Sequence, residues 1–235
     1  MIKNKINPIL VFFLLLLGMA CFSYIPIMLF DIPYETFDTK MSLLYSLYCD
    51  VGFIMILGLI YSKVIVENFK SYFKNFRENF EYSFKYYFAG LLIMIGSNLI
   101  ITLFFKNAIA GNEELVRSAI DDFPLYMVFS VSIYAPFVEE LIFRHSIRDC
   151  VRPYKQNKLT KFIYVFISGF VFALLHILGT AQGLIDYIFI IPYMSLGVAF
   201  ALLYYNTNNI WSSILMHAFH NTITIILYLS TGGMI

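Results

Sequence analysis

The sequence predicts an all-α membrane protein, a bundle of about seven transmembrane helices with one amphipathic helix at the membrane interface. Of its 235 residues, 60% are hydrophobic and only 13% are charged, and the mean hydropathy is +0.76. Soluble domains carry about 25% charged residues, so too little polar surface is present to cover a soluble globule of this size. In addition, several apolar runs reach the length of about 20 residues that a spanning helix needs.

Seven apolar runs are long enough to span a membrane. The predicted spans are residues 8–30, 42–64, 86–105, 123–147, 161–179, 184–205 and 209–230. Lys3 and Lys5 precede the first run, as in a signal peptide. That run is too long for a signal peptide and lacks a small-residue cleavage site, so we expect it to remain as a span. No internal repeat is evident, which disfavours a transporter built from symmetric halves.

Residues 67–85 form a different kind of segment. Aromatic residues recur there at helical spacing, with basic residues among them: Phe69, Phe73, Phe76, Phe80 and Tyr87, with Lys70, Lys74, Arg77 and Lys85. This pattern predicts an amphipathic helix in the headgroup region of an anionic leaflet, with membrane lipid as its partner. A helix that binds a calmodulin-like partner is the alternative.

Basic residues gather on one side of the predicted spans. With the N-terminus in the cytoplasm, the inner segments hold Lys3, Lys5, Lys63, Lys70, Lys74, Arg77, Lys85, Arg148, Arg152, Lys155, Lys158 and Lys161. The outer segments hold only Lys40, Lys106 and Arg117. Cytoplasmic loops are enriched in Lys and Arg, so we expect a multi-pass protein of the cell membrane with a cytoplasmic N-terminus.

Neither the net charge nor the cysteines suggest another class of protein. The net charge of +1 gives no indication of nucleic-acid binding. Cys21, Cys49 and Cys150 form no CxxC pair, so we expect buried thiols and no disulfide.

Glu139, Glu140 and Arg144 lie inside the predicted span 123–147. An ionisable residue at membrane depth is a candidate functional residue, because its insertion costs about 2.5 kcal/mol or more. Glu140 and Arg144 are four residues apart and can pair on one helix face. Glu139 points about 100° away and has no cation near it in sequence, which suits a general base. The alternative is that both glutamates only brace neighbouring helices.

Histidines and an asparagine supply further polar groups in later spans. His176 lies in span 161–179, and His217 and Asn221 lie four residues apart in span 209–230. Their N–H groups can stabilise an oxyanion in a dry site, although hydrogen bonding between helices is the alternative. The spacing does not exclude His220. His145 is interpreted as a headgroup contact and Asp50 as a structural or accessory group.

Depth places these groups in one layer. At about 1.5 Å per residue, Glu139 lies roughly 14–20 Å from the surface marked by Arg148 and Arg152, and His176 roughly 22 Å from Lys161. His217 and Asn221 lie roughly 12 and 18 Å from Asn209. We therefore expect a shared polar cavity that is open to the cytoplasmic side.

These motifs resemble those of the CPBP family of intramembrane proteases, also called Abi or CAAX-protease-like proteins. The family pattern EExxxR, FxxxH and HxxxN is similar to Glu139-Glu140-x3-Arg144, Phe172-x3-His176 and His217-x3-Asn221. The resemblance covers residues 139–221. It implies a division into residues 1–120, N-terminal transmembrane helices, and residues 121–230, a catalytic core.

The resemblance also implies roles for the site residues. Glu139 activates water, His176 helps to hold it, and His217 and Asn221 stabilise the oxyanion. Glu140 with Arg144 orders the site, and Phe172 belongs to its binding residues. Glu139, His176 and His217 can also supply three zinc ligands, with water as the fourth. A glutamate mechanism needs no metal, and we favour it.

The predicted function is therefore that of an intramembrane endopeptidase acting on a membrane-associated peptide or protein. The composition suggests a bacterial chain, and bacterial members resemble proteins of peptide processing or bacteriocin self-immunity. Two other classes compete. One is a non-catalytic scaffold or sensor that regulates a partner membrane protein, and the other is a transporter or proton-coupled channel, since buried carboxylates also line ion paths.

Overall fold

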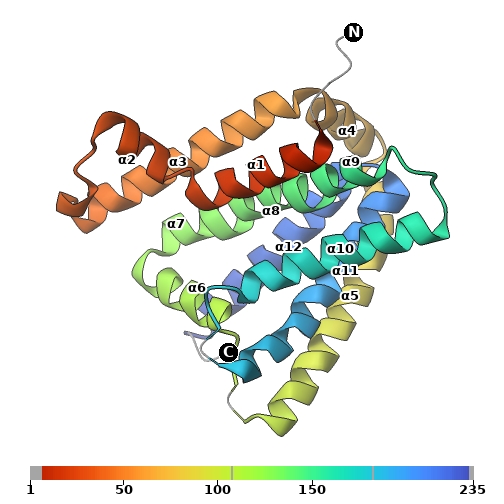
Figure 1. Ribbon diagram of the computed structural model, residues 1–235. Coiled ribbons are helices and arrows are strands. Elements are labelled where there is room, and N and C mark those ends of the chain that lie inside the picture. The colour runs from red at the N-terminus through yellow and green to blue at the C-terminus, as the bar shows by residue number, and fades with distance from the viewer. Residues whose placement is uncertain (1–6, 107, 182, 233–235) are drawn as a thin grey trace.

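The computed structural model in Figure 1 describes residues 7–106, 108–181 and 183–232, and no strand occurs among them. The helices are α1 (Pro8–Cys21), α2 (Tyr24–Phe30), α3 (Thr39–Ile60), α4 (Ser62–Lys74), α5 (Phe76–Phe104), α6 (Gly111–Asp122), α7 (Pro124–Phe129), α8 (Ala135–Glu139), α9 (Ile147–Val151), α10 (Lys158–Ile177), α11 (Ile190–Thr207) and α12 (Ile210–Ser230). Short 3-10 turns occupy Tyr34–Thr36 and Leu184–Phe189. The all-α class predicted from composition is confirmed.

Among the described residues, six helices are long and apolar enough to cross a membrane. They are Thr39–Ile60, Phe76–Phe104, Pro124–Val151, Lys158–Ile177, Leu184–Thr207 and Ile210–Ser230. The first predicted span, 8–30, is instead a pair of helices, α1 and α2, bent by 75°. Pro26 explains this break, because it has no N–H and its ring would clash with the carbonyl of Phe22 in a continuous helix. Counted as one span, the bent pair brings the total to seven.

The span that carries the paired glutamates is not a uniform α-helix. Two π-helical segments, Ser130–Tyr134 and Glu140–Ser146, join α7, α8 and α9. Single π-turns inside α-helices occur frequently at functional sites. Here the second segment begins directly after Glu139, at the point where the two carboxylates diverge.

The predicted amphipathic helix 67–85 is divided between two elements. The backbone breaks at Asn75 (φ −128°, ψ 54°), so that its first part belongs to α4 and its second part to the long helix α5. The contacts between aromatic rings continue across the break. The ring centroids are 4.4 Å apart for Phe69 and Phe73 and 5.5 Å apart for Phe73 and Phe76. A single helix was predicted because the spacing of aromatic residues does not reveal one residue with non-helical backbone angles.

Side-chain caps set the start of the helices that carry the histidines. Asn157 accepts a hydrogen bond from Thr160 N at 2.9 Å at the start of α10, and Asn209 accepts from Trp211 N at 3.0 Å at the start of α12. Asparagine is among the preferred N-cap residues. Helix α4 is tied to the same end of α12, because Trp211 Nε1 donates to Ile65 O at 2.9 Å.

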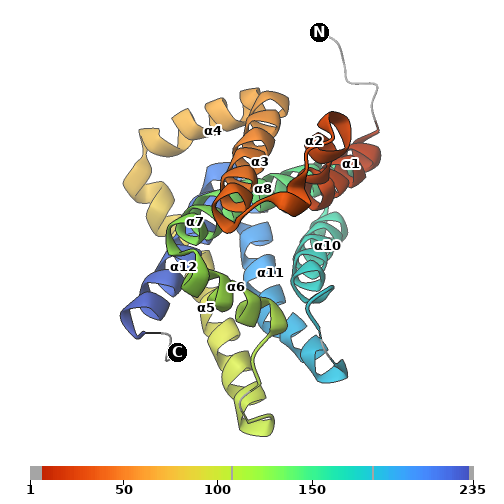
Figure 2. The same cartoon turned by 90° about the vertical axis from the view of Figure 1, so that its left-hand side faces the viewer.

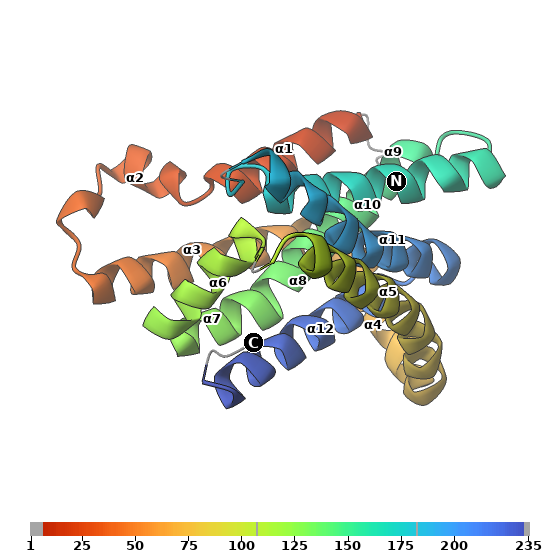
Figure 3. The same ribbon diagram turned by 90° about the horizontal axis from the view of Figure 1, so that it is seen from below.

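The bundle has two distinct ends. We call the end with α4, the first part of α5, α9, the start of α10 and the start of α12 the basic end, and the opposite end the α6 end. In Figure 1 the basic end lies at the upper right, and α6 lies at the lower left, beside the end of α12. Figure 2 looks onto the α6 end, where α6 crosses in front of α5, α11 and α12. Figure 3 shows that α2 and the start of α3 project beyond the other helices at that end.

Candidate active site

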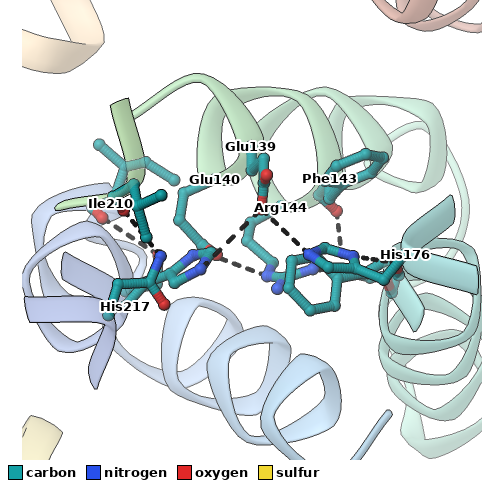
Figure 4. Close-up of polar contacts among 12 residues, drawn as sticks. Glu139, Glu140, Phe143, Arg144, His176, Ile210 and His217 are labelled. Atoms are coloured by element: carbon teal, nitrogen blue, oxygen red, sulfur yellow. Dashed lines mark hydrogen bonds and ion pairs between the residues drawn. The ribbon is translucent and has the colours of Figure 1, made fainter. Parts of the chain in front are cut away.

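Three side chains from three helices converge at the centre of the bundle. Glu139 Oε2 lies 4.0 Å from His176 Nε2 and 3.9 Å from His217 Nε2. This oxygen is buried and has no hydrogen-bond partner within the described protein. Figure 4 shows the carboxylate of Glu139 between the two imidazole rings. The sequence prediction that α8, α10 and α12 bring polar groups to one layer is confirmed for these three residues.

The other nitrogen of each imidazole is held in place. His176 Nδ1 lies 2.8 Å from Phe172 O, and because a carbonyl only accepts, Nδ1 carries the proton. His217 Nδ1 lies 3.0 Å from Glu140 Oε1, a carboxylate that is also an acceptor when ionised. In their neutral forms both rings therefore present a lone pair at Nε2 toward Glu139. Glu139 Oε2 and the two Nε2 atoms are thus all hydrogen-bond acceptors. A molecule that lies between them must therefore donate hydrogen bonds.

Glu140 and Arg144 form a buried ion pair, as their spacing predicts. Glu140 Oε2 lies 3.0 Å from Arg144 Nε, and both side chains are fully buried. Arg144 also donates to Ser168 Oγ at 3.2 Å. Glu140 thus connects Arg144 with His217. The predicted pairing of Glu140 with Arg144 is confirmed, and the two glutamates contact His217 through different ring nitrogens.

Phe172 links the guanidinium to the imidazoles. The Arg144 guanidinium lies 4.6 Å from the centroid of the Phe172 ring, within the range of a cation–π contact. The centroid of His176 lies 4.3 Å from the same ring, and that of His217 lies 5.7 Å from it. The FxxxH spacing therefore gives one face of α10 both an imidazole and the ring that packs against it.

Asn221 and His220 line the same space but are placed differently from Glu139 and its partners. Asn221 Nδ2 donates to Val131 O at 2.8 Å, so one of its two amide hydrogens braces the first π-helical segment. His220 Nδ1 lies 3.4 Å from Tyr87 OH, and both His220 and Asn221 line the cavity described below.

Two polar residues of the sequence analysis lie elsewhere. Asp50 accepts from Tyr126 OH at 2.9 Å, in keeping with a structural role. His145 is not a headgroup contact, because it is only 2% exposed and its Nδ1 lies 2.6 Å from Tyr204 OH. Its neighbour Asp149 lies 3.6 Å from Nε2. The interpretation of His145 as a headgroup contact was wrong, because Tyr61 and Tyr204 cover its ring. The position of His145 near the end of a span does not reveal these contacts.

Two aromatic residues that the sequence analysis did not identify complete the surroundings of the histidines. The Tyr193 ring lies 4.9 Å from that of His176, at an angle of 32°, and its hydroxyl accepts from Asn112 Nδ2 at 3.5 Å. Phe200 stacks on His217 at 5.3 Å and 26°. An aromatic residue in an apolar run looks like a core residue, so no sequence signal distinguishes these two.

A cavity of about 770 Å³ opens on this cluster. Its walls include Glu139, His176, His217 and residues of α5, α6, α7 and the start of α11. Contrary to the sequence prediction, the cavity does not open toward the basic residues, because its lining extends from Glu139 toward α6. Counting residues along a helix gives the depth of a site residue in the membrane. It does not show which half of the bundle is filled by large side chains. On the basic side, Leu141, Ile142 and Phe143 are at most 1% exposed.

Glu139, His176 and His217 offer the kinds of donor atom that zinc prefers. Tetrahedral zinc at about 2.1 Å would place ligand atoms about 3.4 Å apart, whereas Glu139 Oε2 is 4.0 and 3.9 Å from the two Nε2 atoms. No group of three His, Cys, Asp or Glu in the described part of the chain has metal-site geometry. The wider spacing suits a water molecule, with hydrogen bonds of about 2.8 Å.

Fold and site together define a multi-pass helical membrane protein with a buried glutamate–histidine cluster. Residues 121–223 match the family described as type II CAAX prenyl endopeptidase Rce1-like. This segment of the chain is therefore similar to that family of CAAX-type membrane peptidases, in keeping with the motifs around Glu139, His176 and His217. No solved structure matches the chain significantly.

Two bacterial proteins are similar to the chain. It is 30% identical over 118 residues to a putative membrane peptidase, YdiL, of Bacillus subtilis, a match of 50% of this chain and 43% of that protein. It is 28% identical over 138 residues to the membrane-embedded CAAX protease MroQ of Staphylococcus aureus, a match of 58% of this chain and 52% of that protein. The chain thus matches about half the length of these curated relatives.

Proposed function

We propose that the protein is an intramembrane endopeptidase in which Glu139 activates a water molecule for attack on a peptide bond. The observation that carries this proposal is the unpartnered Oε2 of Glu139, 4.0 and 3.9 Å from two imidazole Nε2 atoms. One water between these atoms can donate one hydrogen to the carboxylate and the other to an imidazole. Its oxygen lone pair then remains free for the carbonyl carbon of the substrate.

Hydrolysis follows from this placement. Glu139 takes a proton from the water as the oxygen bonds to the carbonyl carbon, and the carbonyl oxygen becomes an oxyanion. Asn221 lines the cavity and has one amide hydrogen beyond the one given to Val131 O, so it can donate to this oxyanion. Glu139 then passes its proton to the leaving nitrogen as the C–N bond breaks. Atoms and charge balance without a further reactant.

Glu140 and Arg144 act through His217. The carboxylate of Glu140 fixes the Nδ1 proton of His217, and this leaves Nε2 facing Glu139. Arg144 keeps Glu140 ionised in a fully buried position. These two residues are positioning residues.

The proposed substrate is a membrane-associated peptide or protein, as in peptide maturation or bacteriocin self-immunity. The relative named as a membrane-embedded CAAX protease supports a peptide substrate. The apolar part of the cavity wall, which includes Met94, Ile120 and Phe189, suits apolar side chains next to the scissile bond.

Glu139→Gln tests the proposal, because the amide keeps the shape of the carboxylate and cannot accept the proton. Purified protein in detergent is incubated with a pool of apolar peptides, and products are identified by mass spectrometry. We expect cleavage to fall by a factor of at least about 100, the lower range for general-base catalysis, with an unchanged melting temperature. Asp50→Asn, at another membrane carboxylate, is the matched control and should cleave as the wild type does.

A folded Glu139→Gln variant with full cleavage would refute the role of Glu139. The same preparations also test the water-only mechanism. Protein treated with a chelator should keep its cleavage rate, and loss that zinc restores would show that a metal holds the water.

A further inference from the structure

We propose that the substrate reaches Glu139 from the α6 end of the bundle, which lies outside the cytoplasm, so that the substrate is an exported peptide or the extracytoplasmic part of a membrane protein. This inference rests on the proposed function, whose site it uses. Three sets of observations support it: the direction of the cavity, the packing on its other side, and the distribution of charge.

The cavity extends in one direction from the catalytic layer on every helix that lines it. On α12 it is lined from His217 to Tyr228, and on α10 only by His176, which lies at the end of that helix nearest α6. On α11 the lining residues are Pro192 and Tyr193, in its first turn. Each of these stretches runs toward the α6 end, so the open path to Glu139 comes from there.

The half of the bundle toward the basic end is filled. Leu141, Ile142, Tyr164, Tyr204 and Ile210 are each at most 1% exposed and belong to one hydrophobic core. Protein interiors pack with few voids larger than a water molecule. An extended peptide therefore has no path through this half to the carboxylate of Glu139.

The charges indicate which end faces the cytoplasm. Ten described basic residues belong to the basic-end segments: Lys63, Lys70, Lys74, Arg77, Lys85, Arg148, Arg152, Lys155, Lys158 and Lys161. The segments of the α6 end hold three: Lys40, Lys106 and Arg117. Cytoplasmic segments carry the excess of Lys and Arg, so the basic end faces inward and the cavity faces outward.

Helix α6 borders the path that a substrate takes. Its start is in close contact with the turn that follows α10, since a Cβ on Gly111 would lie 2.3 Å from Thr180 O. Further along, the Arg117 guanidinium lies 5.7 Å from the centre of the Tyr228 ring on α12. Val116 and Ile120, on either side of Arg117 in the sequence, line the cavity. A bulky group on Val116 should therefore obstruct the path, whereas one on exposed Leu115 should not.

Single cysteines test both parts of the inference. In a chain with Cys21, Cys49 and Cys150 replaced by alanine, the variants Leu115→Cys, Val116→Cys and Lys155→Cys are treated in intact cells with a bulky, membrane-impermeant maleimide. We expect the cysteines at 115 and 116 to be labelled and the one at 155 to be labelled only after permeabilisation. Purified and labelled, only the Val116→Cys protein should lose peptide cleavage, by at least tenfold. Thr224→Cys, on the α12 wall, replaces Val116→Cys if that variant does not fold.

The reverse pattern, with position 155 labelled in intact cells and position 115 protected, would overturn the assignment of sides. Full labelling at 116 or 224 with undiminished cleavage would overturn the path along α6. Neither labelling pattern depends on catalysis, so a failure of the proposed function, seen as full cleavage by Glu139→Gln, is distinguishable from a failure of this inference.

Discussion

Arg144 shows how one side chain organises the site without touching the proposed water. It has no exposed surface, and its guanidinium is paired with Glu140, bonded to Ser168 and placed over the ring of Phe172. Glu140 in turn holds His217, which faces Glu139. A buried ion pair contributes little net stability, but removing one partner leaves an uncompensated charge. Arg144 therefore matters most through what its loss would do to Glu140.

Replacing Arg144 by methionine should destabilise the protein by about 3–5 kcal/mol, the range for breaking a buried pair. The double variant Glu140→Leu, Arg144→Met should recover most of this loss because no charge remains buried. It should still cleave poorly, since His217 loses its partner. Unfolding in detergent and peptide cleavage measure the two effects separately. Arg77→Gln, in an ion pair whose arginine is 91% exposed, is the control and should change neither quantity.

At the scale of elements, α10 and α11 set the position of His176. Their backbones approach closely, since a Cβ on Gly197 would lie 3.0 Å from Gly169 O. A Cβ on Gly169 would lie 2.7 Å from Val198 Cγ2 and 3.0 Å from Val198 N. Small residues at such crossings allow transmembrane helices to pack closely.

Gly169→Ala should therefore push α10 away from α11. We expect a loss of about 1–3 kcal/mol, as for other overpacked sites, together with slower cleavage because His176 moves relative to Glu139. Gly96→Ala is the matched control in a helix where a Cβ meets nothing within 4 Å, and it should be neutral or stabilising. Equal melting temperatures and cleavage rates for the two variants would contradict this account of the crossing.

The elements also show what the sequence can and cannot predict. Apolar runs identify the spans because length and composition alone decide whether a helix crosses a membrane. The Glu140–Arg144 pair follows from a spacing of four residues. By contrast, the bend before α2, the break at Asn75 and the contact of Tyr193 with His176 depend on local backbone geometry or on contacts between distant segments. The side on which the cavity opens depends on how densely both halves are packed.

At the scale of the whole molecule, the family segment 121–223 is only part of the structure around the site. Helix α5 packs against α11 so closely that a Cβ on Gly90 would lie 2.6 Å from Ala199 Cβ. Met94, Ile95 and Asn98 of α5 form part of the cavity wall. The predicted division into residues 1–120 and 121–230 therefore separates two sets of helices that share one cavity. Each set is expected to need the other for activity.

A split chain tests this dependence. Separately encoded residues 1–107 and 108–235 should insert as spanning helices and then associate, because transmembrane helices can form before they pack. We expect the two fragments to copurify and to cleave peptide, and the second fragment alone to be inactive. Gly90→Leu in the first fragment should prevent association by blocking contact with Ala199, whereas Gly96→Leu should not. Cleavage by residues 108–235 alone would show that the wall supplied by α5 is dispensable.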